Sequence, residues 1–306
     1  MSGIPYCDEV WEVTGGCTKC SPGCLNCWAV KEVWRLAHNP LQGDKWKGLV
    51  EKKDGVLSWT GKIECFNDAL EIPLRRKKPT RYFVDSKADL FHEKVSIGFL
   101  THVFDTIEQC PQHTFLILTK RPKQALKMMW GKHGEGWKYF GKGDYHPNVH
   151  FGVSISTLDE MWKVTELSRI PAAVRWVSFE PLLADVGVIL LTSCREDDTD
   201  LEEFGQHIDG VIVGGESGPG ARPMCPDWVR SIRDQCVAAG VPFYFKQWGE
   251  WLPVHQRTKE QFEINTCNFW PKRVTDIEGE RFFRFTKKKA GHLLDGKEWK
   301  QLPERR

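Results

Sequence analysis

The sequence lacks the features that mark several special classes of protein. No apolar run approaches the ~20 residues that a membrane-spanning helix needs, and the opening MSGIPYCDEVWE has neither the basic nor the apolar region of a secretory signal. Charge of one sign is not in excess, since 43 Lys+Arg stand against 41 Asp+Glu, a formal net charge of +2. With 41% hydrophobic and 27% charged residues, general disorder is excluded. We expect a folded cytoplasmic protein with no membrane partner and no DNA-coating charge.

A disulfide scaffold is also not indicated, although the chain contains 11 cysteines. The number is odd, the chain is long enough to bury a core, and the expected compartment is reducing. Four cysteines fall within eleven positions: Cys17, Cys20, Cys24 and Cys27. The other seven are scattered and are expected to be small buried side chains: Cys7, Cys65, Cys110, Cys194, Cys225, Cys236 and Cys267.

Short β-rich runs recur along the chain, and most precede a helical pattern. The predicted strands are Glu9–Thr14, Lys62–Asn67, Arg81–Asp85, Thr114–Thr119, Asn148–Ser154, Val174–Phe179, Gly210–Val213 and Pro242–Lys246. The predicted helices include Lys94–Gln109, Leu158–Ser168 and Asp227–Ala239. This alternation predicts an α/β fold, a (β/α) barrel, complete or partial, over residues 1–250, with an open doubly wound sheet as the alternative. Residues 251–306 are expected to form a small C-terminal extension or cap.

Some segments fall outside this alternation. Asn39–Thr60 is polar and contains tryptophan, Gly131–Pro147 is rich in glycine, lysine and aromatic residues, and Ser193–Asp209 is acidic. Two basic runs, Arg75–Arg81 and Lys287–Lys289, add cations that can meet phosphates, while aromatic rings can stack on bases. We therefore expect a nucleic-acid or nucleotide substrate, although the small net charge is unusual for a dedicated nucleic-acid binder.

The clustered cysteines lie in a loop, GGCTKCSPGCLNCW from Gly15 to Trp28, that directly follows the first predicted strand. Three alternatives fit the spacing. The first is a [4Fe–4S] cluster held by three thiolates, because Cys20-x3-Cys24-x2-Cys27 has the spacing of radical S-adenosylmethionine (SAM) enzymes and Cys17-x6-Cys24 is a wider variant. The second is a closed cluster with four thiolates. The third is a structural zinc site, although paired CxxC motifs that bind zinc usually lie farther apart.

The loop resembles the signature of a phage-associated three-cysteine-motif family. The resemblance continues over roughly residues 10–251 through further motifs: DSKADLFH from Asp85, PQHT from Pro111, LTKRP from Leu118, SFEPL from Ser178, VGGESGPGARP from Val213 and FKQWGE from Phe245. The family looks like a divergent branch of radical SAM enzymes. The resemblance implies a TIM-like radical SAM core with loop insertions, a [4Fe–4S] cluster, and bound SAM at the iron that no thiolate holds.

The resemblance also implies which cysteines bind the cluster. The family's three cysteines align with Cys17, Cys24 and Cys27, whereas position 20 is usually apolar there. Cys17, Cys24 and Cys27 are therefore the expected ligands and catalytic residues. Cys20 departs from the family pattern and is the alternative third ligand.

Other candidate site residues follow the predicted strands, at the end of a barrel where substrates bind. We expect one group to contact the cofactor: Asp85, Ser86, Lys120, Gly214, Gly215, Glu216, Ser217 and Lys246. We expect a second group to contact the substrate: Asp89, His92, Arg121, Glu180 and Trp248. Structural roles are the alternative for each: a helix cap for Asp89, a buried hydrogen-bonded ring for His92, a glycine corner for Gly214–Ser217, and ion pairs among the charged groups.

These observations predict a radical SAM enzyme of the isomerase, mutase or lyase type. It would cleave SAM reductively and use the 5′-deoxyadenosyl radical to rearrange or modify a nucleobase, such as a hypermodified pyrimidine in phage DNA. It would work in a bacterial host cell, encoded by a phage or mobile element, with flavodoxin or ferredoxin as electron donor. The alternatives are a radical SAM lyase that repairs a DNA base lesion, and a nucleic-acid-binding protein stabilised by zinc or a cluster without catalysis.

Overall fold

The computed structural model describes residues 3–41, 43–130, 146–189, 208–258 and 274–303. The chain forms two compact units. The first comprises Met1–Val153 and Lys163–Arg175, and the second comprises Ser154–Trp162 and Trp176–Glu304. None of the helices within the described ranges is long and apolar enough to span a membrane.

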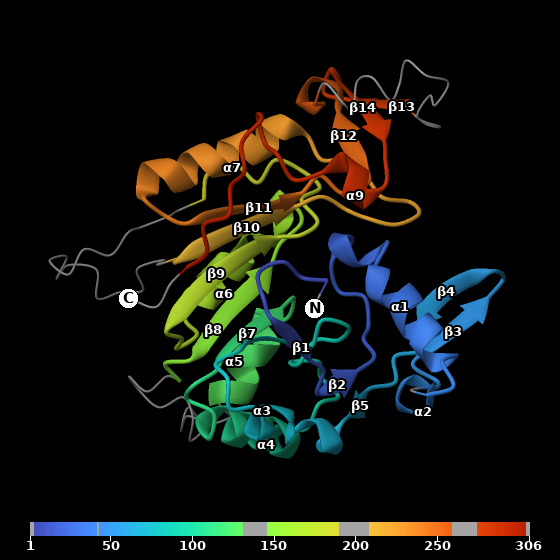
Figure 1. The fold of residues 1–306 in the computed structure, drawn as a ribbon, viewed down its shortest axis with the longest axis vertical. Coiled ribbons are helices and arrows are strands. Elements are labelled where there is room, and N and C mark those ends of the chain that lie inside the picture. The colour runs from blue at the N-terminus through green and yellow to red at the C-terminus, as the bar shows by residue number, and fades with distance from the viewer. Residues whose placement is uncertain (1–2, 42, 131–145, 190–207, 259–273, 304–306) are drawn as a thin grey trace, which may run out of the picture. The chain divides into compact units, whose positions relative to one another are not determined.

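The main element is a seven-stranded parallel sheet, seen in Figure 1 as arrows that run from blue to orange. Its strand order is β1 (Glu9–Trp11), β6 (Arg81–Val84), β7 (Thr114–Thr119), β8 (Val149–Ser154), β9 (Val174–Phe179), β10 (Gly210–Gly214) and β11 (Phe243–Gln247). The strands form a curled half-barrel. The predicted α/β fold is thus confirmed in its partial form. Strand β8 is buried at all six positions, as expected for a strand covered on both faces.

Helices connect successive strands of the sheet. They are α4 (Ile97–Glu108), α5 (Pro122–Trp130), α6 (Trp162–Ser168) after the short helix η3 (Leu158–Glu160), and α7 (Pro226–Ala239). Ser96 caps α4 because its side chain accepts a hydrogen bond from the backbone N–H of Phe99 at 3.2 Å. Gly240 ends α7 in the left-handed conformation, with φ of 65°. The three helices named from the sequence are confirmed with small changes at their ends.

The predicted strand Lys62–Asn67 is wrong as a barrel strand. Only Glu64–Cys65 (β5) is extended, and it pairs antiparallel with β2 (Thr14–Gly15), outside the seven-stranded sheet. After β1, the Asp85 carboxyl group accepts hydrogen bonds from the backbone N–H groups of Val13 and Thr14, at 2.8 and 2.9 Å. A side chain thus occupies these two N–H groups, and the chain that follows pairs as β2 with β5.

The segment after the cysteine loop forms a small insertion in the first unit. It contains α1 (Trp28–Ala37), α2 (Gly43–Trp46) and a hairpin of β3 (Val50–Lys53) and β4 (Val56–Trp59). The short helices η2 (Asn67–Ala69) and α3 (Ile72–Arg75) follow β5. The polar, tryptophan-bearing segment Asn39–Thr60 therefore has secondary structure of its own.

The second unit carries a three-stranded antiparallel sheet after the last barrel strand. Its order is β12 (Trp251–Pro253), β14 (Glu280–Arg284) and β13 (Val274–Ile277), accompanied by η4 (Val254–Gln256) and α9 (Lys287–Ala290). A segment beyond α9 lies along β11: the N–H of Phe245 donates to the carbonyl of Trp299 at 2.8 Å, and the N–H of Gln301 donates to that of Phe243 at 3.2 Å. This pairing covers the edge of the main sheet that would otherwise be open.

Candidate functional site

The cysteine loop is fixed at both ends. At its start, Gly16 has φ of 88° and bridges to Ala88, and a Cβ at this position would lie 2.1 Å from the carbonyl oxygen of Lys62. Only glycine fits there. Within the loop, Pro22–Cys24 (η1) forms a single turn whose Gly23 N–H donates to the Ser21 hydroxyl at 3.2 Å. Helix α1 begins directly after Cys27, which holds the far end of the loop.

The four thiols of the loop influence one another. Cys24 is buried, Cys17 and Cys27 are half-buried, and Cys20 is exposed. Cys20 donates a hydrogen bond to Cys24, which lowers the pKa of Cys24 to about 5 and raises that of Cys20. Burial raises the pKa of Cys17 to about 12, and negative charge on Asp89, Cys24 and Cys27 acts in the same direction. Burial also raises the pKa of Cys27. The thiols therefore lie within electrostatic reach of one another.

The donor set of this loop fits an iron–sulfur cluster. Across the described part of the chain, no three His, Cys, Asp or Glu side chains are grouped to hold a single metal ion. A [4Fe–4S] cluster requires a different arrangement, because each thiolate binds a different iron and the sulfurs surround the cluster rather than converge on one ion. The four thiols of the loop are the donor atoms that such a cluster uses, with Cys17, Cys24 and Cys27 as the set that the resemblance implies.

Arg121 fastens the cysteine loop to the end of β7. One terminal nitrogen, Nη2, donates to the carbonyl and the hydroxyl of Thr18, both at 2.8 Å. The other, Nη1, donates to Asp89 Oδ2 at 3.1 Å and lies 3.8 Å from Cys17 Sγ. Nε donates to Glu93 at 3.3 Å. The loop is thus bound to a charged side chain rather than left to the solvent.

Asp89 and His92 belong to the same network. Asp89 accepts hydrogen bonds from the backbone N–H groups of Phe91 and Lys120, at 3.1 and 3.0 Å. The Nδ1 atom of His92 accepts from the backbone N–H of Lys94 at 3.2 Å, so the proton of the neutral ring is on Nε2, which lies 2.9 Å from the Thr18 hydroxyl. Burial lowers the pKa of His92, which favours this neutral ring. The structure brings together Asp89, His92 and Arg121, which were predicted to contact substrate, and gives each a partner in or beside the cysteine loop.

Asp85 and Ser86, predicted to contact the cofactor, follow β6. Asp85 is buried with φ of 55° and holds the backbone after β1, as described above. Ser86 donates its hydroxyl hydrogen bond to Glu12, which also binds the Lys87 ammonium. Lys120, the third of these predicted residues in the first unit, contributes a positive charge that lowers the pKa of Cys24 and Cys27. Among Asp85, Ser86 and Lys120, it is Lys120 whose charge influences the pKa of thiols in the cysteine loop.

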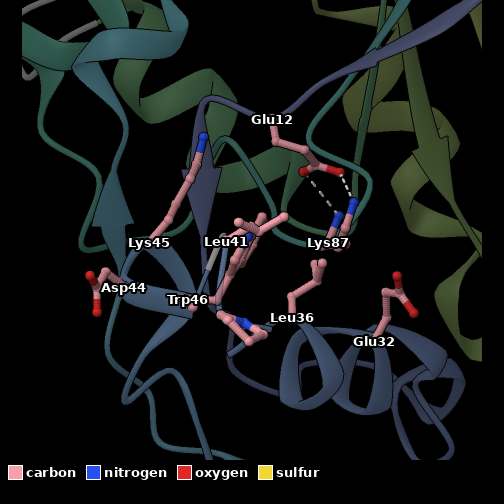
Figure 2. A pocket seen from close by; sticks show the side chains of 10 residues that line it. Glu12, Glu32, Leu36, Leu41, Asp44, Lys45, Trp46 and Lys87 are labelled. Carbon is pink, nitrogen blue, oxygen red and sulfur yellow. Dashed lines mark hydrogen bonds and ion pairs between the residues drawn. The ribbon is translucent and has the colours of Figure 1, made fainter. Parts of the chain in front are cut away.

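A cavity of about 570 Å³ lies beside Glu12 and Lys87, between them and helices α1 and α2. Figure 2 shows the Glu12–Lys87 pair on one side of the cavity and Leu36 and Trp46 on the other. The Lys87 ammonium lies 5.7 Å from the centre of the Trp46 ring. The volume is within the range of small-ligand sites, and its walls combine apolar groups with charges of both signs. Ser86 is not among the lining residues, but it binds Glu12, which is.

In the second unit, Glu180 and Lys246 form an ion pair of 2.6 Å, with side chains 14% and 16% exposed. Ser178 donates to the other Glu180 oxygen at 3.0 Å. Gly214 leaves room for the pair, because a Cβ there would lie 3.0 Å from Glu180 Oε1. The pKa of Lys287 is lowered by burial and by the charge of Lys246, and the charge of Glu180 acts in the opposite direction. A second ammonium group therefore lies near this pair. The predicted residues Glu180, Gly214 and Lys246 thus come together at the ends of β9, β10 and β11.

The remaining predicted residues of the second unit have structural partners. Glu216 is 5% exposed and binds Arg222 through three hydrogen bonds of 2.6 to 2.8 Å. A Cβ on Gly215 would lie 2.0 Å from the carbonyl oxygen of Trp248. Trp248 is 1% exposed, packs on Phe245 and donates its indole N–H to the carbonyl of Leu293 at 2.8 Å, which is the placement of a core residue. Ser217 is half-buried beside this corner.

Some residues of these sites were missed from the sequence. Thr18 and Glu93 bind Arg121, Glu12 binds Lys87, and Lys287 lies near Glu180. Of these residues, only Lys287 was indicated by the sequence, because it belongs to the basic run Lys287–Lys289. Gln247 ends β11, and its Oε1 atom is buried with no hydrogen-bond partner in the part of the chain that the structure describes.

Two sequence features lie outside the described residues. They are most of the basic and aromatic segment Gly131–Pro147 and most of the acidic segment Ser193–Asp209. Cys194 and Cys267 also lie outside the description. The expectation that the Gly131–Pro147 segment binds nucleic acid therefore stays a prediction.

Comparisons with known proteins give the chain a family. The chain is similar to a solved structure of a spore photoproduct lyase mutant with bound AdoMet and dinucleoside spore photoproduct. The match covers 91% of this chain and 68% of that chain, with 11% sequence identity and a TM-score of 0.35. No curated protein matches the sequence. The sequence profile of one family matches residues 1–303, almost the whole chain. The chain therefore belongs to the family described as "Protein of unknown function (DUF5131)".

Proposed function

We propose that this protein is a radical SAM enzyme whose cluster is held by Cys17, Cys24 and Cys27. The observation that carries the proposal is the cysteine loop itself: thiols within electrostatic reach of one another, in a loop fixed at both ends, after the first strand of a partial (β/α) barrel. When bound, a [4Fe–4S] cluster supplies the electron that splits the C–S bond of SAM into methionine and a 5′-deoxyadenosyl radical.

The chain's own residues have distinct tasks in this proposal. The three cysteines hold the cluster, and Lys120 places a positive charge near Cys24 and Cys27, which stabilises their thiolates. In the second unit, Lys246 and Glu180 offer an ammonium and a carboxylate that can bind the polar groups of a ligand. The cavity beside Glu12 and Lys87 is a second place where a small ligand fits.

For the substrate, we propose a nucleobase, in DNA or in a nucleotide, with a hypermodified pyrimidine of phage DNA as the preferred form and a base lesion as the alternative. The support is the basic run Arg75–Arg81 and the run Lys287–Lys289. Within the first run, Arg75 pairs with Glu71 and Arg76 pairs with Glu9. Lys77 and Lys78 follow Arg76 in the sequence and precede strand β6. We further propose flavodoxin or ferredoxin as the electron donor.

The test begins with anaerobic reconstitution of the full chain with iron and sulfide. We expect a brown protein with about four irons and four sulfides per chain. After reduction, added SAM should yield 5′-deoxyadenosine, detected by liquid chromatography. A colourless protein with one zinc ion would falsify the proposal. Comparing the nucleosides of host and phage DNA with and without the gene, by mass spectrometry, then tests the substrate.

One observation favours a second candidate function. Cys20 donates a hydrogen bond to Cys24, so the loop offers a fourth thiol beside one of the expected ligands. Four thiolates would close a cluster or a zinc site and leave no position for SAM. The protein would then be a nucleic-acid-binding protein stabilised by its metal. Production of 5′-deoxyadenosine by Cys20→Ala, and its loss in Cys17→Ala, would reject this candidate.

A further inference from the structure

Arg121 makes a set of contacts that binding the loop backbone alone would not require. Its side chain is 5% exposed, and its guanidinium reaches Thr18, Asp89 and Glu93 as well as Cys17. Nη1 lies 3.8 Å from Cys17 Sγ, within hydrogen-bond distance for sulfur. The structure gives no such contact from Arg121 to another sulfur of the loop among the hydrogen bonds of the described residues, so the contact distinguishes Cys17 from its neighbours.

The position of the guanidinium is fixed from the opposite side. The Asp89 carboxylate that binds Nη1 is itself held by the Thr119 hydroxyl at 2.7 Å and by the backbone N–H of Lys120 at 3.0 Å. Thr119 in turn accepts from the backbone N–H of Arg121 at 2.9 Å. Because arginine keeps its proton at all ordinary pH values, a positive charge is held permanently beside Cys17.

From this geometry we propose that Arg121 is a positioning residue that hydrogen-bonds the Cys17 sulfur and sets how readily the cluster accepts an electron. The inference rests on the proposed function. Hydrogen bonds to cluster sulfurs and nearby charge are among the factors that set the potentials of iron–sulfur sites. A buried cation favours the reduced cluster, which carries one more negative charge. The electron comes from the external donor.

The negative partners of Arg121 act in the opposite direction. Glu93 lies 3.3 Å from Nε, and its side chain is 57% exposed. It therefore offsets part of the positive charge and can be changed with little cost to folding. Replacing Glu93 by glutamine should raise the reduction potential, whereas replacing Arg121 by glutamine should lower it.

The experiment is a redox titration of the reconstituted protein, followed by the electron paramagnetic resonance signal of the reduced cluster, with iron measured on each sample. Arg121→Gln should shift the midpoint to more negative potential, Arg121→Lys should shift it less, and Glu93→Gln should shift it to more positive potential. Arg35→Gln is the matched control, because Arg35 is on α1, pairs with Glu32 and is exposed; its midpoint should equal that of the wild type.

The outcomes separate the inference from the proposed function. If the wild type binds no iron, the proposed function fails and the inference with it. If the wild type binds the cluster and Glu93→Gln leaves the midpoint unchanged, only the inference is overturned. That variant decides the question even where Arg121→Gln does not fold. A shift of the same size in Arg35→Gln would also overturn it, since the effect would then be one of total charge.

Discussion

The cysteine loop of the first unit and the Glu180–Lys246 pair of the second unit are built in different ways. In the loop, Arg121 binds the backbone of Thr18 and the sulfur of Cys17, and the carboxylate of Asp89 holds the guanidinium in place, so the thiols are presented on a fixed frame. In the second unit, two oppositely charged side chains bind each other directly at the strand ends. The first arrangement suits a cofactor held by several side chains. The second suits a small molecule whose charged groups replace the partners of the ion pair.

The largest effect is expected when an expected cluster ligand of the cysteine loop is removed. Cys24→Ala should reduce the iron content of the reconstituted protein from about four per chain to less than one, because a cluster cannot be held by two thiolates. Cys20→Ala is the matched control and should keep its iron. The measurement is iron and sulfide analysis after desalting. Equal losses in both variants would show that Cys20 is a ligand, either in place of Cys17 or in addition to it.

The next largest effect is expected when the carboxylate that holds Arg121 against the cysteine loop is removed. Asp89→Ala should lower the free energy of unfolding by about 3–5 kcal/mol, because it leaves the buried Arg121 guanidinium with the exposed Glu93 as its remaining carboxylate partner. Asp44→Ala, at an exposed position of α2, should change it by less than about 0.5 kcal/mol. Urea unfolding followed by circular dichroism gives both values. A loss below 1 kcal/mol in Asp89→Ala would contradict the network described here.

A smaller effect is expected in the second region. Glu180→Gln should cost about 1–3 kcal/mol in stability, since Lys246 loses its charged partner in a mostly buried position. A double-mutant cycle with Lys246→Met measures the coupling of the pair. The iron content should not change. If Glu180→Gln lost iron as Cys24→Ala does, the contrast between the two regions would be wrong.

The pH dependence of stability sharpens the role assigned to Asp85. Burial, with the nearby Glu12, raises the pKa of Asp85 to about 8. The folded state therefore binds a proton that the unfolded state releases near pH 4, and this contribution to stability is present below about pH 4 and declines as the pH rises to about 8. The slope is at most about 1.4 kcal/mol per pH unit. Asp85→Asn should show a flatter profile from pH 5 to 8 in urea titrations; an unchanged slope would assign the dependence to other groups.

Much of the fold could be predicted from local pattern. Apolar runs such as Thr114–Thr119 and Val174–Phe179 are strands with the expected bounds, because their burial on both faces requires such sequences. Lys62–Asn67 was also predicted to be a strand of the barrel, yet its extended part, β5, pairs outside the sheet. Asp85 binds the backbone of Val13 and Thr14 just before and within β2, and no local pattern reveals contacts made across 72 and 71 positions.

The candidate site was predictable in part for the same reason. The spacing of the cysteines was sufficient to single out the loop, and the strand-end rule was sufficient to single out Asp89, Arg121, Glu180 and Lys246. Their partners were not predictable. Thr18 and Glu93 are ordinary residues until the fold places them on Arg121, and Trp248 stands in a polar motif although its ring lies in the core.

The pairing of Trp299–Gln301 with β11 has a consequence for how the chain is made. The backbone groups that complete this side of the barrel come from a stretch translated well after β11, with a separate small sheet synthesised in between. While the ribosome is still adding those residues, β11 has unsatisfied amides and carbonyls that another strand could take up. Nascent chains stalled before Trp299 should therefore be the species most prone to associate with one another.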